Sequence, residues 1–225
     1  MGQEAHCTYE HPSAQNIHLT QSQYVNAIAN ELFISVAASL ANRMLFNKSY
    51  YLGWASKGWD WFSNSGLINE GNLINDGLDL ATCQNNQYTT WTYNQGVILG
   101  GLVELSKALG DDTYLEPAIS IATATMKTMS GTDGILREPC EPNCGDNGSQ
   151  FKGIFMRNLQ YLQEASPSFE FESFIQANAM SIWESNRGDD DMLGLMWAGP
   201  YDNAGNAATQ SSALEALIAA VSTLK

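Results

Sequence analysis

Apolar residues recur at intervals of three and four positions along most of this chain of 225 residues. That spacing places them on one face of an α-helix, because a helix completes a turn every 3.6 residues. The pattern predicts about seven helices, at roughly 22–45, 49–64, 91–109, 112–130, 149–164, 167–186 and 205–223. No convincing pair of strands interrupts them. We therefore predict an all-α fold of short, separately capped helices.

Two kinds of helix alternate in this pattern. Those that begin near residues 22, 91, 149 and 205 are rich in small residues, whereas the others are ordinarily amphipathic. Small residues let neighbouring helices approach closely, so the first kind fits an inner layer. Their starts recur every 55 to 70 residues or so, which indicates helical hairpins arranged as a closed toroid or an open solenoid.

Local signals mark the ends of several helices. Gly110 is predicted to end one helix, and Thr113 and Glu116 fit a capping box for the next. Ser166 before Pro167 predicts the cap of another helix. The first turns of the inner helices are expected to meet at one end of the ring.

Acidic residues outnumber basic ones, with 24 Asp and Glu against 10 Lys and Arg and a formal net charge of -14. Such a surface repels polyanions, so nucleic acid and acidic membranes are poor candidate partners. No apolar run approaches the roughly 18 to 20 residues that a membrane-spanning helix needs. Charged residues make up only 15% of the chain, and its abundant amides, hydroxyls and aromatic rings suit a neutral, hydroxyl-rich ligand.

Four cysteines are present, and Cys140 and Cys144 enclose a short Glu-Pro-Asn turn. We predict a disulfide between these two, because a zinc site would need a second pair of Cys or His residues near by. Cys7 and Cys83 either form a second bridge or remain buried thiols, and the sequence leaves this pairing open. Two glycosylation sequons agree with a secretory origin.

The stretch from Trp91 to Gly96 combines aromatic and amide side chains at a predicted helix start. We expect Trp91, Tyr93, Asn94 and Gln95 to contact a ligand, since helix starts also offer unpaired N–H groups to sugar hydroxyls. The aromatic residues of the helix 49–64 are instead interpreted as core, because an outer helix places bulky side chains between inner ones.

Two long loops, 66–90 and 131–149, are expected to build part of the same site, because long ordered loops over a scaffold often carry binding residues. The first contains Asp76 and Asp79, which either face a cleft or organise a turn. The second contains Glu138, for which pairing with a neighbouring cation competes with a chemical role.

Cleavage of a glycosidic bond normally needs two carboxyl groups, roughly 5 to 9.5 Å apart. Asp111 and Asp112 are interpreted as a turn, and 189–191 as a solvated charge run with weak calcium binding as a minor alternative. Glu31 lies on an inner helix, but no second acid accompanies it nearby in sequence. No residue is therefore assigned a catalytic role. Neither a metal site nor a cofactor motif is found.

Six further stretches stand out, in chain order. They are Asn26–Phe33, Ser65–Asn69, Asn75–Asp79, Trp91–Gly96, Ile135–Glu141 and Gln150–Gly153. Together with the closing segment around Trp197 and Gln210, they resemble glycoside hydrolase family 76, the endo-α-1,6-mannanases. The resemblance covers about residues 22 to 224, and is therefore more specific than any single motif.

The resemblance implies an (α/α)6 toroid, of which this chain would be a partial barrel of about seven helices. Residues 1–21 would be an irregular segment, and 22–225 the C-terminal part of a glycosidase-like domain. In the family, the catalytic residues are an adjacent Asp-Asp pair upstream of the matching part, and 1–21 contain nothing like it. Little or no activity is expected of this chain alone. A partial barrel would also expose apolar flanks, which self-association, rearrangement or a second polypeptide would cover.

The resemblance further implies α-mannan or a manno-oligosaccharide as the ligand. The residues expected to hold its hydroxyls or rings are Asn30, Asp76, Asp79, Trp91, Tyr93, Asn94, Gln95, Gln150 and Lys152. The parent protein would hydrolyse or transglycosylate α-1,6-linked mannan, without a cofactor, outside the cell or in the cell wall. The alternative is a non-catalytic mannan-binding or secreted interaction protein.

Overall fold

The computed structural model describes residues 24–224 and is built almost entirely of helices. The helices are α1 (Ala27–Arg43), α2 (Lys48–Asn64), α3 (Thr92–Leu109), α4 (Leu115–Thr128), α5 (Gly145–Gly148), α6 (Phe151–Ala165), α7 (Phe169–Ser185) and α8 (Ala207–Ser222). Two 3-10 turns, η1 (Leu45–Asn47) and η2 (Asp112–Tyr114), precede α2 and α4. The seven long helices match the seven predicted segments, which confirms the all-α fold class.

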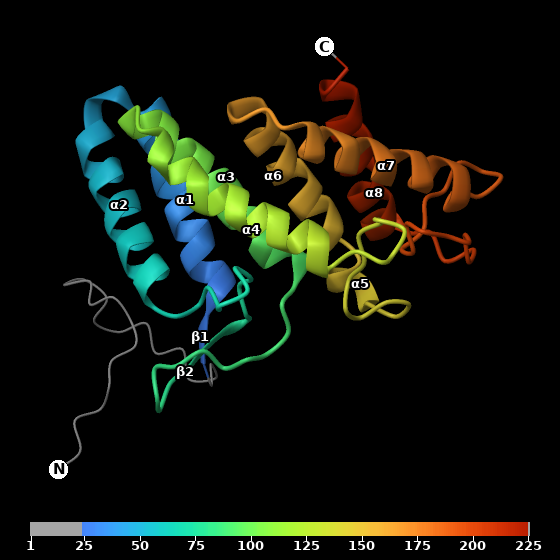
Figure 1. The fold of residues 1–225 in the computed structure, drawn as a ribbon, viewed down its shortest axis with the longest axis horizontal. Helices are drawn as coiled ribbons and strands as arrows, with labels where there is room; N and C mark the ends of the chain where they lie inside the picture. Colours follow the sequence, from blue (N-terminus) through green and yellow to red (C-terminus); the bar gives the residue numbers. More distant parts are fainter. Residues whose placement is uncertain (1–23, 225) are drawn as a thin grey trace.

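The long helices form an arc of two layers (Figure 1). Successive inner helices pack side by side, in the order α1, α3, α6 and α8. The outer helices α2, α4 and α7 pack against α1, α3 and α8 respectively and return the chain to the next inner helix. Every inner helix therefore runs in the same direction, and its first turn lies on the side of the arc that carries the long loops (Figure 1). The predicted alternation of inner and outer helices is confirmed.

Small residues bring the inner helices into backbone contact. A side chain added at Gly96 of α3 would lie 2.6 Å from the Cα of Phe155 on α6, and one at Gly153 of α6 would lie 2.6 Å from the Cα of Ser212 on α8. The backbone N–H of Gly153 also donates to Ser212 Oγ at 2.9 Å. Only glycine permits approaches this close, which explains the small residues of the inner layer.

A two-stranded sheet, which the sequence did not predict, joins the start of α1 to the loop 66–90. Strand β1 (Tyr24–Asn26) pairs antiparallel with β2 (Gly77–Asp79), so that Val25 lies opposite Leu78. Both of these side chains are buried. Strands of three residues are too short to show an alternating pattern, and for this reason the prediction of no strand pair was wrong.

Helix ends agree with the sequence signals in one case and differ in two. Gly110 ends α3 in the left-handed conformation, with φ 69° and ψ 36°, as predicted. The capping box before α4 is wrong, because the carboxylate of Asp111 accepts from the N–H and hydroxyl of Thr113 and caps η2 instead. The cap of α7 is Ser168, which accepts from Glu170 N, so the chain passes Pro167 before the helix begins.

The core lies between the two layers, and α2 contributes aromatic side chains to it. Trp59 and Phe62 are buried there with stacked rings 6.2 Å apart, whereas Tyr50 is 62% exposed. The interpretation of the aromatic residues of α2 as core is therefore right for its second half.

Within residues 24–224, no helix is both long and apolar enough to cross a membrane.

Candidate functional site

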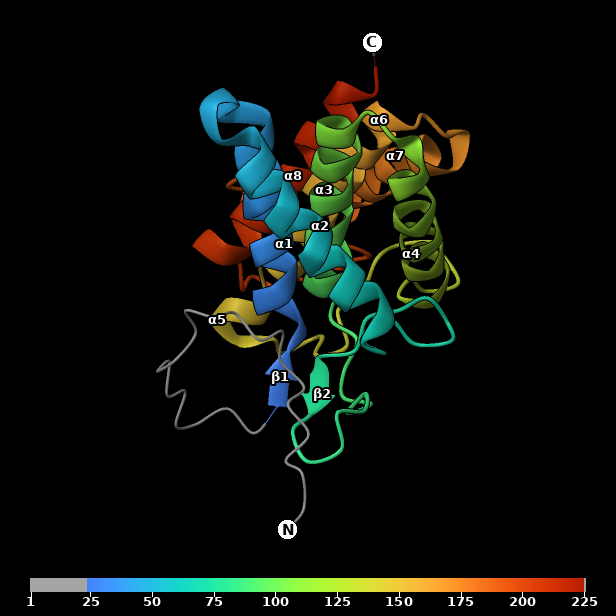
Figure 2. The ribbon, with the colours of Figure 1, turned by 90° about the vertical axis from the view of Figure 1, so that its left-hand side faces the viewer.

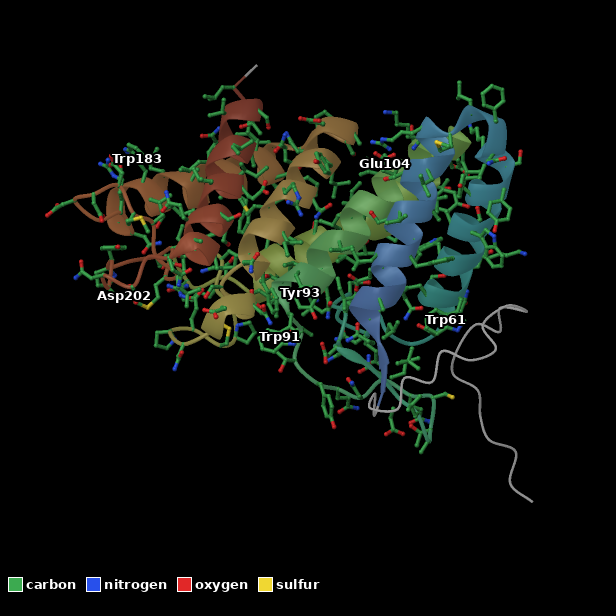
Figure 3. The ribbon with its side chains drawn as sticks, turned by 180° about the vertical axis from the view of Figure 1, so that it is seen from behind. Trp61, Trp91, Tyr93, Glu104, Trp183 and Asp202 are labelled. Atoms are coloured by element: carbon green, nitrogen blue, oxygen red, sulfur yellow. A yellow bond between two sulfur atoms is a disulfide. The ribbon has the colours of Figure 1, made fainter. Side chains whose placement is uncertain are left out.

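Three aromatic rings meet where the inner helices α3 and α6 begin. Trp91 is the N-cap of α3 and has extended backbone angles, and Tyr93 lies in the first turn. The ring centre of Phe151, at the start of α6, lies 5.7 Å from that of Trp91 and 4.1 Å from that of Tyr93. Figure 3 shows Trp91 and Tyr93 at the opposite end of α3 from Glu104. Two of the predicted binding residues are thus brought together with a third ring.

A cavity of about 350 Å³ lies beside these rings, and we call it the mouth. Its lining consists of Asp76, Trp91, Tyr93, Phe151, Gly148 and the two half-cystines Cys140 and Cys144. Asp76 reaches it because its backbone carbonyl accepts from Ala27 N at 2.9 Å, which fixes the loop 66–90 to the start of α1. The mouth therefore combines aromatic faces with one half-buried carboxylate, a combination that suits a sugar ring and its hydroxyls.

A disulfide joins Cys140 and Cys144 and forms one wall of the mouth. The predicted pairing of these two residues is confirmed, and the described part of the chain contains no cluster of residues that could hold a metal ion. The other predicted pairing involves Cys7, which lies outside the described residues.

Asp79 organises a turn within the loop 66–90. Its carboxylate accepts from Ala81 N at 3.0 Å, and from the N–H and hydroxyl of Thr82 at 2.9 and 3.0 Å. The hydrogen bond from the Thr82 hydroxyl is the main reason that the pKa of Asp79 is lowered. Of the two aspartates in this loop, Asp76 lines the mouth and Asp79 shapes the backbone.

Asn30 and Gln150 lie at the starts of α1 and α6. The Asn30 amide donates to the backbone carbonyl of Asn26 at 2.8 Å, which holds the side chain along its own helix. Gln150 is exposed, and its amide makes a long bond of 3.4 Å to the carbonyl of Asp146. Neither residue lines the mouth itself, although Gln150 directly precedes Phe151 and is open to solvent.

Gln95 is buried and fully engaged with backbone groups. Its side-chain oxygen accepts from Ile74 N, and its amide donates to the carbonyl of Ile74, both at 2.8 Å. A further bond of 3.0 Å reaches the carbonyl of Trp91. Gln95 therefore connects the loop 66–90 to the first turn of α3, and its effect on a ligand in the mouth would act through Trp91 and the loop.

Glu138 closes the first turn of α3 from the second long loop. Its carboxylate accepts from Thr92 N at 3.1 Å and from the Thr92 hydroxyl. Burial raises the pKa of Glu138 to about 7, against the opposing effect of the two Thr92 hydrogen bonds. The ion pair of Glu138 with Arg137 or Lys152 that the sequence allowed is not formed, because Arg137 pairs with Asp133 at 2.6 Å and Lys152 pairs with Glu141.

Lys152 is completely buried below the mouth. Its ammonium group forms an ion pair with Glu141, donates to the carbonyl of Leu195 at 2.7 Å and lies 4.6 Å from the ring centre of Trp197. Burial lowers the pKa of Lys152, while Glu141 acts in the opposite direction. Lys152 thus connects the disulfide loop to the segment before α8, and these contacts leave its ammonium group no room to bind sugar directly.

Glu31 and Asn94 lie in the interface between α1 and α3. Both side chains are 0% exposed, and among the described residues neither the carboxylate oxygens of Glu31 nor the amide atoms of Asn94 have a hydrogen-bond partner. Burial raises the pKa of Glu31 well above its ordinary value, and the charge of Asp76 raises it further. The second acid near Glu31, which was not found nearby in sequence, is Asp76 from the neighbouring loop.

Sequence reasoning placed Phe151 at the same end of the ring without naming it as a binding residue, weighed Glu138 without assigning it a role, and gave Glu141 no part in the site. Phe151 stands between two residues that were selected, and its aromatic ring could have been grouped with Trp91. Glu138 and Glu141 act through their contacts with the buried Thr92 and Lys152. These contacts join residues that are distant in sequence, so no local sequence pattern predicts them. The charge run 189–191 stays exposed, with Asp191 paired to Arg187 at 2.8 Å.

An arc of helical hairpins whose inner helices begin around an aromatic and acidic cavity defines a helical, glycosidase-like domain. The chain matches the model of glycosyl hydrolase family 76 over residues 14–224. The chain therefore belongs to glycosyl hydrolase family 76. This agrees with the predicted resemblance.

Among curated proteins, the chain is similar to fungal proteins named mannan endo-1,6-alpha-mannosidase. The chain is 29% identical to DCW1 of Candida albicans over 86% of its own length and 46% of that protein. It is 30% identical to DCW1 of Saccharomyces cerevisiae over 87% of its own length and 45% of that protein. The chain thus spans about half the length of the curated relatives it matches.

Solved structures show the same fold. The Lin0763 protein of Listeria innocua superposes with a TM-score of 0.78 at 29% identity, over 89% of this chain and 56% of that one. An inactive variant of the alpha-1,6-mannanase GH76A from a Salegentibacter species, in complex with alpha-1,6-mannotriose, gives 0.76 at 25% identity, over 89% of this chain and 60% of that one. These likenesses support the assignment of the arc to the α/α-barrel type.

Proposed function

We propose that this chain forms the mannan-binding part of a glycoside hydrolase that acts on α-1,6-linked mannan. The observation that carries the proposal is the mouth, where the rings of Trp91, Tyr93 and Phe151 lie beside the carboxylate of Asp76. A related enzyme of the same fold has been solved with alpha-1,6-mannotriose bound. In this chain the aromatic faces would support a sugar ring, and Asp76 would accept hydrogen bonds from its hydroxyls.

The predicted binding residues then divide into two groups. Asp76, Trp91 and Tyr93 would contact the sugar directly, and Gln150 would reach it from the rim. Asn30, Asp79, Gln95 and Lys152 would act indirectly, by fixing the loops and helix starts that shape the mouth. Asn94 is buried without a hydrogen-bond partner among the described residues, and would act only through the packing of α1 against α3. The first group should determine affinity, and the second should determine the stability of the site.

Calorimetric titration of the purified chain with α-1,6-mannotriose tests this function. Tyr93→Ala should weaken binding about tenfold, because a lost aromatic contact of roughly 1.4 kcal/mol corresponds to that factor. The matched control is Tyr161→Ala, which removes a ring that is 44% exposed on α6 and lies outside the mouth lining. Equal affinities for the two variants would refute the assignment of the mouth.

A second candidate is a mannan-binding protein without catalysis. Among the described residues, Asp76 is the only carboxylate in the lining of the mouth, whereas glycosidic cleavage normally uses two. Product analysis after incubation with α-1,6-mannan distinguishes the candidates. Binding without products supports the second one, and release of oligosaccharides at an ordinary rate supports a complete active site.

We further propose an extracellular or cell-wall location, which agrees with the disulfide and with the fungal relatives. We also propose that the chain associates with itself through exposed apolar surfaces at the two ends of its arc. Fractionation of the source cells tests the location.

A further inference from the structure

A second cavity, of about 300 Å³, lies beside the start of α3. Its lining comes from the residue before Trp91, from the end of α4 and from the loop that follows α4, and includes Thr90, Met129, Ser130, Arg137, Glu138 and Pro139. Figure 2 shows that α4 ends on the same side of the arc as β1, β2 and α5. We call this cavity the side pocket.

The side pocket and the mouth share a rim at two places. Thr90 lines the side pocket, and the next residue, Trp91, lines the mouth. In the same way, Pro139 lines the side pocket and Cys140 lines the mouth. Consecutive Cα atoms are about 3.8 Å apart, so one peptide unit separates the two cavities on each segment. Both cavities are open to solvent, so a ligand that extends beyond the mouth can cross this rim.

The wall of the side pocket is a short hairpin after α4, and other parts of the fold hold it in place. Arg137 N donates to the carbonyl of Met129 at 2.8 Å, which closes the hairpin onto the end of α4. Leu136 N donates to the side-chain oxygen of Asn178 on α7 at 2.9 Å. These bonds form without a ligand, and preformed shape is usual in binding sites for small molecules.

Arg137 brings hydrogen-bond donors to the side pocket. Its side chain is 40% exposed, and the carboxylate of Asp133 accepts from two of its nitrogens at 2.9 and 2.6 Å. A guanidinium group has five N–H donors, so donors remain for a ligand. The ion pair also fixes the direction in which the guanidinium group points.

Ser130, on the opposite strand of the hairpin, carries a hydroxyl group that the fold leaves unsatisfied. Its oxygen is buried and has no hydrogen-bond partner among residues 24–224. Such groups are rare in native proteins, and one explanation is a water molecule or ligand that completes them. The side pocket, which Ser130 lines, provides room for that partner.

The charges around the side pocket select a neutral ligand. An anion would meet the carboxyl group of Glu138 and a chain of net charge -14, and the lining cation Arg137 already pairs with Asp133. A cation would lie beside the guanidinium group. A sugar is neutral and both donates and accepts, which fits the N–H donors of Arg137 and the hydroxyl of Thr90 beside the apolar Pro139.

We propose that the side pocket is a second sugar subsite, which holds the part of an α-1,6-linked manno-oligosaccharide that extends beyond the mouth. This inference rests on the proposed function and adds where a longer ligand goes. Arg137 donates to hydroxyls of the extending sugar, and the segment Thr90–Trp91 forms the crossing between the two subsites. Because the sugar units are linked, binding of one part raises the effective concentration of the other.

Calorimetric titrations with α-1,6-mannotriose and with α-1,6-mannohexaose measure the two subsites separately. The wild type should bind one mannohexaose per chain, about tenfold more tightly than mannotriose, because the added contacts include one or two hydrogen bonds to a charged group. Arg137→Ala should reduce this gain to about threefold or less. Its affinity for mannotriose should equal that of the wild type.

Gly131→Ala tests the position of the guanidinium group without removing it. The added methyl group would lie 1.4 Å from Nη1 of Arg137, so this flexible side chain must move away while the backbone stays in place. The gain with mannohexaose should fall as it does in Arg137→Ala. Circular dichroism confirms that each variant is folded.

Arg157→Ala is the matched control. Arg157 lies on α6 outside both cavities, is 42% exposed and pairs with Glu215, so its removal costs a similar ion pair and the same charge. This variant should keep the full gain with mannohexaose.

Each remaining outcome decides against the side pocket in a recognisable way. An equal gain in wild type and Arg137→Ala, or no gain in the wild type, would refute the subsite while binding of mannotriose upholds the mouth. Two mannohexaose molecules per chain would show independent sites and refute the crossing. Loss of mannotriose affinity in Arg137→Ala would show that Arg137 acts on the mouth itself. If the wild type binds neither sugar, the proposed function fails together with the subsite.

Discussion

Glu138 shows how a buried carboxyl group can serve a helix start and still titrate near neutral pH. Its carboxylate accepts two hydrogen bonds from Thr92, yet burial raises its pKa from the ordinary 4.5 to about 7. A raised pKa in the folded state means that the folded protein binds the proton more tightly than the unfolded chain does. The stabilising contribution of the proton is therefore complete below the unfolded pKa and is lost as the pH rises toward 7.

Replacement of Glu138 by Gln should remove this dependence, because an amide does not titrate. Between about pH 5 and about pH 8, the free energy of unfolding of the wild type should fall by about 1–3 kcal/mol more than that of Glu138→Gln. Urea unfolding at both pH values measures the difference. Glu70→Gln, at an exposed position, is the control and should follow the wild type. Parallel pH profiles for wild type and Glu138→Gln would contradict the assigned pKa.

Glu31 and Asn94 are polar groups that the fold does not satisfy. A buried polar group without a hydrogen bond costs about 1–3 kcal/mol, so this pair lowers the stability of the α1–α3 interface. Unsatisfied groups are rare in native interiors and gather at functional sites. Glu31 lies close enough to Asp76, which lines the mouth, for the charge of Asp76 to raise its pKa, and this is consistent with that tendency.

At the scale of the helices, two glycines on different layers allow a direct comparison. Gly153→Ala on α6 would place a methyl group 2.6 Å from the Cα of Ser212, so it should destabilise the fold by about 1–3 kcal/mol through a forced backbone shift. Gly53→Ala on α2 meets nothing within 4 Å and should stabilise by about 0.5–1 kcal/mol, because alanine favours a helix over glycine. Urea midpoints of the two variants check both signs. A neutral Gly153→Ala would mean that α6 and α8 can separate.

The helices could be predicted from sequence because each has its own periodic pattern and local end signals. The strands β1 and β2 could not be predicted. Each forms only because it pairs with the other, and the hydrogen bond from Ala27 N to the carbonyl of Asp76 holds the two segments together. The caps at Asp111 and Ser168 were displaced by a few residues because short polar side chains compete for the same backbone groups.

The candidate binding site was predictable only in part, for a related reason. Trp91 and Tyr93 lie at the start of α3, so the predicted start of this helix was enough to place them on the loop side of the arc. Whether Gln95 and Lys152 face the ligand depends on Ile74, Glu141 and Leu195, which come from other parts of the chain. Several loops build this site, and their packing decides whether a side chain such as that of Gln95 or Lys152 is buried. The sequence of one segment alone does not predict that packing.

At the scale of the whole molecule, the mouth involves two inner helices, the loop 66–90 and the disulfide loop, so a bound sugar should stabilise the domain. At one hundred times its dissociation constant, a ligand adds about 2.7 kcal/mol, which corresponds to a rise in Tm of roughly 5–10 °C for a domain of this size. Thermal unfolding with α-1,6-mannotriose measures the rise. Maltotriose is the control sugar, and an equal rise with it would show that the effect is not specific to mannose.

The shared direction of α1, α3, α6 and α8 gives the arc a top and a bottom that differ chemically. The N–H groups of the four inner helix starts lie on the side of the arc that carries the mouth, which α3 and α6 line themselves, whereas the carbonyl groups of the helix ends lie on the far side (Figure 1). A linear polysaccharide is also directional, since one terminus is a reducing sugar and the other is not. A scaffold of parallel inner helices can therefore distinguish the two orientations of the proposed mannan ligand, which an antiparallel bundle with mixed helix ends would do less readily.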